Sequence, residues 1–163
     1  MTRFTRHIRR FARRENGAIL VEFGMALPVL ILFLAVIIEG GRMTWIYQSA
    51  AAGVRDATRM LARMAPPDIC TSGSIATYDA AVTQIVTDTI NGASALPNLA
   101  TVLDVSPTLT CVTGTFRVSP APIVEVRARV QMDYIFGNVF GLFGSSLGPL
   151  ITEVADQSKV YGI

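Results

Sequence analysis

One long apolar stretch constrains this chain more than any other feature. Between Ala18 and Ile38 the only ionisable side chain is that of Glu22, and fourteen residues are Leu, Ile, Val or Phe. A bilayer core about 30 Å thick needs about 20 apolar helical residues to span it. At about −0.3 to −0.6 kcal/mol each, these residues outweigh a carboxylate that costs about 3 kcal/mol even at the membrane centre. The segment is therefore predicted to be a transmembrane helix.

Basic residues are concentrated on one side of this segment. The 163-residue chain carries a net charge of +2, but residues 1–16 contain six Arg and one Glu, whereas the remainder contains eight basic and eleven acidic residues. Basic residues that flank a membrane helix stay in the cytoplasm. We therefore expect a cytoplasmic N-terminus, with the residues from about 42 onward outside the inner membrane. This position favours a topology signal over a nucleic-acid-binding patch, so no nucleic-acid partner is expected.

The apolar segment differs from an ordinary secretory signal. Such a signal has a hydrophobic region of about 7 to 15 residues and a small-x-small cleavage pattern. Here the region is longer, and the chain continues as Ile37-Ile38-Glu39-Gly40-Gly41-Arg42 without that pattern. The helix is expected to stay in the mature protein. An uncleaved signal anchor with a stray Glu is one alternative.

Several short motifs occur in order around this segment. They are Glu15-Asn16-Gly17-Ala18, Val21-Glu22-Phe23, Ala26-Leu27-Pro28, Glu39-Gly40-Gly41-Arg42 and Ala52-Gly53-Val54-Arg55-Asp56-Ala57-Thr58-Arg59. In this order and spacing they resemble the TadE-like family, which are minor pilins (pseudopilins) of the tight-adherence (Tad), or Flp, pilus system. The resemblance covers roughly residues 15–60.

The resemblance implies processing and assembly roles for the first turns of the helix. The basic leader, Gly17, four apolar or small residues, Glu22 and Phe23 resemble a prepilin peptidase site, so cleavage is expected between Gly17 and Ala18. Glu22 and Phe23 would serve recognition and subunit assembly. The implied partners are the major Flp pilin, a sister minor pilin, the prepilin peptidase and the pilus assembly platform.

A proline lies inside the predicted helix. Pro28 removes the hydrogen bond to the carbonyl of residue 24 and crowds the backbone there. Because residue 24 is Gly, the crowding has some room, and we expect a kink at Gly24 and Pro28 and not a break. A proline that is simply tolerated in the membrane is the alternative.

The helix is predicted to continue beyond the membrane. At the outer interface Arg42 can snorkel outward and pair with Glu39, while Trp45 and Tyr47 fit an aromatic belt. Apolar residues then recur at helical spacing until Pro66-Pro67: Ile46, Ala50, Val54, Ala57, Leu61 and Met64. One helix over 18–64 would be about 70 Å long. Two helices joined at Gly40-Gly41 are the alternative.

The remaining residues predict a small periplasmic α+β domain over 66–163, after a leader over 1–17 and a helix over 18–65. Ser74 is expected to cap a second helix over about 75–91, whose buried side carries Tyr78, Val82, Ile85 and Val86. Strands are expected at 100–105, 108–113, 115–118 and, most strongly, over the alternating run 124–134, with the tail 150–160 returning beside it. The fold class is type IV pilin-like, with an antiparallel sheet.

The segment 135–151 is apolar and rich in glycine. It is too short to span a membrane as a helix and is interrupted by Gly. Three interpretations stay open for it: contact with the membrane surface, packing on neighbouring subunits, or a loop that folds onto the sheet.

The two cysteines, Cys70 and Cys111, both fall in the predicted exported part. An isolated pair in an oxidising compartment predicts a disulfide. Free buried cysteines are the alternative.

Residue types needed for catalysis are scarce. The only histidine, His7, lies in the leader, and the exported acids are dispersed without recognisable pairing. No nucleotide-binding loop occurs. We therefore expect no enzyme activity, catalytic residue, cofactor, metal site or small-molecule substrate.

Together these features predict a single-pass inner-membrane minor pilin needed for assembly of a surface pilus that serves adhesion, and the protein itself could enter the pilus. The competing hypothesis is an uncleaved membrane anchor that carries a periplasmic binding domain. Retention or loss of the leader distinguishes the two.

Overall fold

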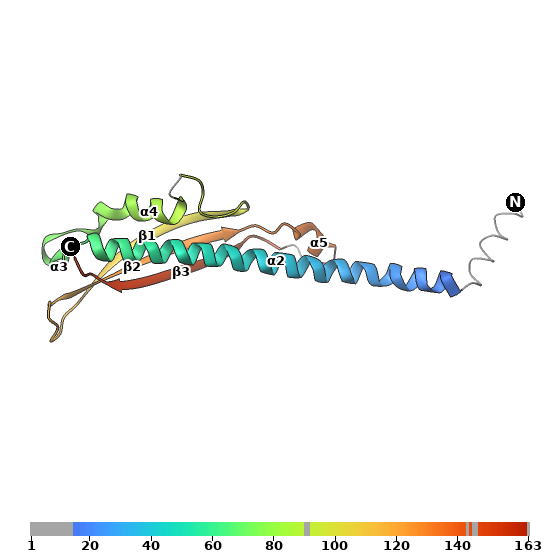
Figure 1. The fold of residues 1–163 in the computed structure, drawn as a ribbon, viewed down its shortest axis with the longest axis horizontal. Coiled ribbons are helices and arrows are strands. Elements are labelled where there is room, and N and C mark those ends of the chain that lie inside the picture. The colour runs from blue at the N-terminus through green and yellow to red at the C-terminus, as the bar shows by residue number, and fades with distance from the viewer. Residues whose placement is uncertain (1–14, 90–91, 143, 145–146, 163) are drawn as a thin grey trace, which may run out of the picture. The chain divides into compact units, whose positions relative to one another are not determined.

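The computed structural model describes residues 15–89, 92–142, 144 and 147–162. Its contacts divide the chain into two units. The first unit contains the residues up to Gly40 and the segment 136–146, and the second contains residues 41–135 and 147–163. Figure 1 gives the element labels.

The longest element is α2, Glu15–Met64, an unbroken α-helix of 50 residues with Pro28 inside it. The prediction of one long helix is therefore confirmed, and Gly40-Gly41 does not divide it. Residues 15–17, which the sequence assigns to the leader, are already helical, since α2 begins at Glu15. Residues 1–14 lie outside the described residues. The helix ends at Met64. Pro66 and Pro67 follow shortly after it, and proline lacks the N–H that would continue the helical hydrogen bonding.

Three short helices follow α2. They are α3 (Ile69–Ser72), the 3-10 helix η1 (Ile75–Tyr78) and α4 (Asp79–Thr87). Ser74 caps η1 as expected, since its hydroxyl accepts the Ala76 N–H at 3.3 Å. The helix predicted to reach residue 91 ends earlier, because Asp88 is extended and forms a bridge with Ser94.

The sheet has three antiparallel strands in the order β1-β2-β3. They are β1 (Ala100–Val112), β2 (Ala121–Met132) and β3 (Leu150–Lys159). The return of the tail beside the strong strand is confirmed. The predicted division of 100–113 into two strands is wrong, because Pro107 pairs opposite Val126 within one continuous strand. An edge strand tolerates proline. The predicted strand at 115–118 is also wrong, since these residues form the turn between β1 and β2.

One face of the sheet forms the core of the second unit. On β2 the alternation is as predicted: Val124, Val126, Ala128, Val130 and Met132 are buried, and Arg127 and Arg129 are exposed. The buried residues form one cluster with the apolar face of α2 and with α4, which lies beside α2 in Figure 1. Its helical members are Ile46, Ala50, Val54, Ala57, Leu61, Ala62, Ile69, Val82 and Val86.

A disulfide joins Cys70 on α3 to Cys111 on β1, as predicted. It links the chain just after the long helix to the edge of the sheet. The two cysteines are 41 residues apart. On the chain-entropy model, closing a loop of this size stabilises the folded state by about 4 kcal/mol.

Replacing both Cys70 and Cys111 with Ser is therefore expected to lower the free energy of unfolding by about 4 kcal/mol. Thermal unfolding of the full chain in detergent micelles, followed by circular dichroism, measures the loss. Thr113→Ser, at an exposed position near Cys111, is the control. Reaction of both cysteines with a thiol reagent in the folded, unreduced protein would contradict the bridge.

Candidate functional site

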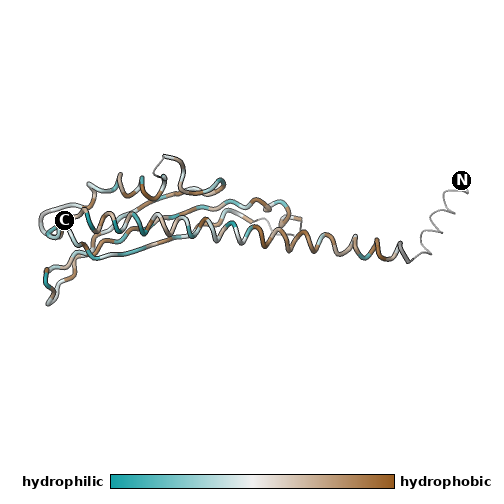
Figure 2. Tube along the Cα trace, in the orientation of Figure 1, coloured by the Kyte–Doolittle hydropathy of each residue, from teal (hydrophilic) through white to brown (hydrophobic). Residues whose placement is uncertain are grey.

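The first part of α2 exposes an unusual amount of apolar surface. Among the described residues, one helix is long and apolar enough to cross a membrane: it starts at Gly17, and its most apolar window has a mean hydropathy of 2.6 and is only 6% buried. Figure 2 shows this half of α2 as almost continuously hydrophobic. Large apolar side chains open to water are unfavourable, and such patches mark interaction surfaces. This helix is a candidate single membrane span.

The predicted processing site lies at the start of this span. Gly17 is half-buried and Ala18 is exposed, both within α2. One turn further on, Glu22 is exposed and Phe23 is 60% exposed. Residues four apart lie on the same face of a helix. Ala18 and Glu22 therefore share one face, and their roles in cleavage and assembly stay predictions.

Pro28 does not break α2. The helix runs through it, and a side chain at Gly24, one turn earlier, would meet no atom within 4 Å outside the local helix backbone. The kink expected at these two residues stays a prediction.

Glu39 is the one buried carboxylate among the described residues, with 3% of its surface exposed. It lies directly after the apolar run, in the first unit. Its carboxylate accepts the backbone N–H of Phe136 at 3.3 Å. A buried carboxylate needs such donors to offset its loss of hydration. Sequence reasoning missed this contact because 97 residues separate the partners.

Arg42 lies in the second unit, where its guanidinium donates to the backbone carbonyl of Asp133. This contact was also not foreseen, because a backbone carbonyl leaves no signal in a sequence. The predicted pairing of Arg42 with Glu39 stays a prediction. Trp45 and Tyr47 are 63% and 46% exposed, as residues of an aromatic belt would be.

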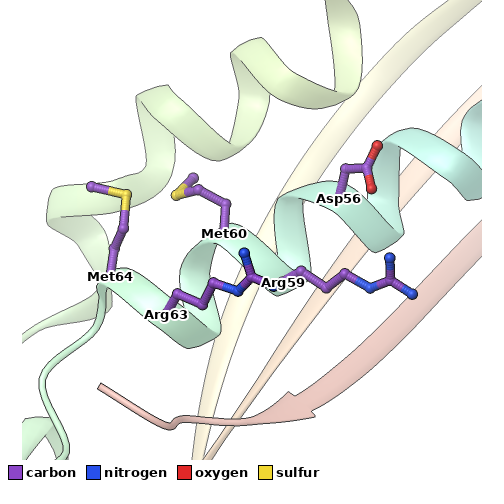
Figure 3. Close-up of a pocket in the computed structure, with 5 residues that line it drawn as sticks. All are labelled: Asp56, Arg59, Met60, Arg63 and Met64. Atoms are coloured by element: carbon purple, nitrogen blue, oxygen red, sulfur yellow. The ribbon is translucent and has the colours of Figure 1, made fainter. Parts of the chain in front are cut away.

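Further along α2, a pocket is lined by Asp56, Arg59, Met60, Arg63 and Met64. Figure 3 shows Arg59 and Arg63 extended along the helix, whereas Met60 and Met64 point toward α4. The two guanidinium groups suit an acidic group of a partner.

The outer face of the sheet holds an ion-pair cluster. Arg127 contacts Glu125 at 2.8 Å and Glu153 at 3.2 Å. The hydrogen bond that Arg127 donates to Glu125, together with the negative charge of Glu125, raises the pKa of Arg127. Within the described ranges, no group of three or more His, Cys, Asp or Glu residues could hold a metal ion.

Comparison with known proteins adds one finding. Residues 17–59 match the family model of the TadE-like protein. That segment is TadE-like. The resemblance inferred from the motifs is therefore confirmed over this range. No curated protein and no solved structure matches the chain.

The TadE-like segment covers about a quarter of the chain and lies entirely on α2. This segment includes the whole apolar run and the predicted processing motif. It also includes the first residues of α2 that pack in the core of the second unit. It ends before the sheet begins. The match therefore relates this segment, and not the whole chain, to the TadE-like family.

Gly53, near the end of the TadE-like segment, has a clear packing role. A Cβ at this position would lie 3.4 Å from the Cα and from the carbonyl oxygen of Val86 on α4. The absence of a side chain therefore lets the two helix backbones approach closely.

Gly53→Leu is expected to destabilise the second unit by about 1–3 kcal/mol, because a large side chain cannot enter this contact without moving α4. Gly41→Leu is the matched control, since a Cβ at Gly41 would meet no atom within 4 Å outside the local helix backbone. Urea unfolding of both full-length variants in detergent compares them. Equal midpoints would show that α4 does not depend on Gly53.

Proposed function

We propose that this protein is a minor pilin of the Tad, or Flp, pilus system. It is inserted as a membrane precursor with a cytoplasmic N-terminus and is processed by a prepilin peptidase at Gly17. The observation that supports the proposal is the match of residues 17–59 to the TadE-like family model. The residues from Gly17 to Phe23 and the exposed apolar span lie within that match, on one continuous helix. The charge difference between the leader and the rest of the chain supports the orientation.

The protein would act as a structural subunit and not as an enzyme. Its partners would be the major Flp pilin, a sister minor pilin and the assembly platform. An apolar helix that is exposed in a single chain can lie in the bilayer before assembly and pack against other pilin helices afterwards. The domain of sheet and short helices, which the Cys70–Cys111 disulfide cross-links, would then lie on the periplasmic side.

Processing at Gly17 is the first test. Protein purified from its native host should begin at Ala18, as measured by intact mass. Gly17→Arg should block cleavage, because a bulky charge cannot enter a site shaped for a residue without a side chain. Gly41→Arg adds the same charge at an exposed helical glycine and should be processed normally. Functional protein that retains Met1 would favour the uncleaved anchor.

Glu22 is proposed to pair with an α-amino group during assembly. Cleavage creates that amine on Ala18, of this chain or of a neighbour. An opposite charge at low dielectric offsets part of the cost of desolvating the carboxylate. A neutral side chain would leave the amine without this partner.

Glu22→Ala should therefore leave membrane insertion and cleavage largely intact but reduce surface piliation strongly. Val21→Ala, at a neighbouring position that is 60% exposed, is the matched control and should assemble normally. Immunoblots give the processed fraction, and electron microscopy counts the pili. Normal piliation in Glu22→Ala would show that the charge is merely tolerated.

A further inference from the structure

The connection between β2 and β3 is unusually apolar. Residues 134–152 contain no Asp, Glu, Lys, Arg or His, whereas Asp133 and Glu153 flank them. A solvated surface loop usually carries polar or charged side chains. Part of this connection, residues 136–146, belongs to the same compact unit as the apolar half of α2. We call residues 136–142 the apolar connection.

A hydrogen bond attaches the apolar connection to α2 at the end of the apolar run. The Phe136 N–H donates to Glu39, which follows the last residue of the apolar run, Ile38. One turn before Glu39, Ala35 is buried with 1% of its surface exposed, while Ile37 is 69% exposed. If the apolar run spans the bilayer, these residues lie at its outer boundary. Phe136 then lies at that boundary too.

Beyond Phe136 the connection exposes one large apolar side chain and forms hydrogen bonds within its own backbone. Leu142 is 84% exposed. The short helix α5, Gly137–Gly141, is closed by hydrogen bonds from Val139 N–H and Phe140 N–H to the Phe136 carbonyl, at 2.9 Å and 3.1 Å. Backbone groups that leave water need such partners. An apolar turn with internal hydrogen bonds is suited to the membrane interface.

We propose that the apolar connection is a second membrane contact, which inserts into the outer leaflet beside the α2 span. The partner is the lipid surface and not a second copy of the chain. Three observations favour lipid: the hydrogen bond to Glu39 at the end of the span, the exposure of the apolar side chains of both Ile37 and Leu142 within one unit, and the lack of charged side chains.

This proposal depends on α2 as a membrane span but not on pilus assembly. It implies that the chain is held at the bilayer by two segments about 100 residues apart in sequence. In this proposal the buried carboxylate of Glu39 orients the start of the inserted turn by accepting the Phe136 N–H.

The test uses single-tryptophan variants of the full chain, made in a Trp45→Phe background, in vesicles of phosphatidylethanolamine and phosphatidylglycerol. Leu142→Trp reports on the apolar connection, and Phe33→Trp reports on the span. Phe116→Trp is the aqueous control, since Phe116 lies in the second unit, in the turn between β1 and β2, and is 51% exposed. Formation of the Cys70–Cys111 bridge verifies that each variant folds.

Lipids brominated near the headgroup should quench most of the Leu142→Trp fluorescence, with a blue-shifted emission, and leave Phe116→Trp unaffected. Red-shifted, unquenched emission from Leu142→Trp would place the connection in water and overturn the proposal. A blue shift that depends on the protein-to-lipid ratio and is not quenched would mean that a second copy covers it, and would overturn it as well.

Phe33→Trp separates failure of this proposal from failure of the span. Lipids brominated deep in the acyl chain should quench it. If Phe33→Trp is quenched and Leu142→Trp is not, only the second contact is wrong. If neither is quenched, α2 does not span the bilayer, and both the second contact and the membrane-inserted pilin are overturned.

Discussion

The exposed apolar surface of α2 is the constraint on which the rest of this structure depends. Water disfavours such a surface, so the first half of the helix needs lipid or other protein around it. The second half of the same helix satisfies its apolar face differently, by packing on a sheet. One continuous element therefore serves two environments. The change occurs near Gly40, where the two compact units divide.

The polar residues around that change have specific partners. Glu39 accepts a backbone N–H from Phe136, and Arg42 donates to the backbone carbonyl of Asp133. Both partners lie near the start of the β2–β3 connection. Charged side chains that leave bulk water are stable only when such groups compensate them. The connection is thus positioned by the two charged residues that follow the apolar run.

The remaining domain is small, and its stability depends on close packing and one covalent bridge. Small residues on α2, such as Ala50 and Ala57, are fully buried against the sheet. Gly53 lets α4 approach α2 directly. The Cys70–Cys111 disulfide then joins the end of the helical region to the edge strand. A disulfide adds to the stability of a domain of this size because its hydrophobic core is small.

The sequence alone determined those features that depend on local pattern. Hydropathy and spacing predicted the continuous helix up to Met64, the alternation of β2 and the return of β3, and the isolated cysteine pair predicted the disulfide. The TadE-like motifs were local too. Some element boundaries were predicted wrongly: residues 100–113 form one strand, whose edge position tolerates Pro107, and α4 ends early because Asp88 pairs with Ser94.

Only the tertiary structure decided what the charged residues after the span contact. The hydrogen bonds of Glu39 and Arg42 join residues more than 90 positions apart, and their partners are backbone groups, which every residue type carries. No residue pattern can encode such a contact. The burial of Glu39 and the attachment of the apolar connection to α2 therefore follow from how the chain folds back and not from any motif.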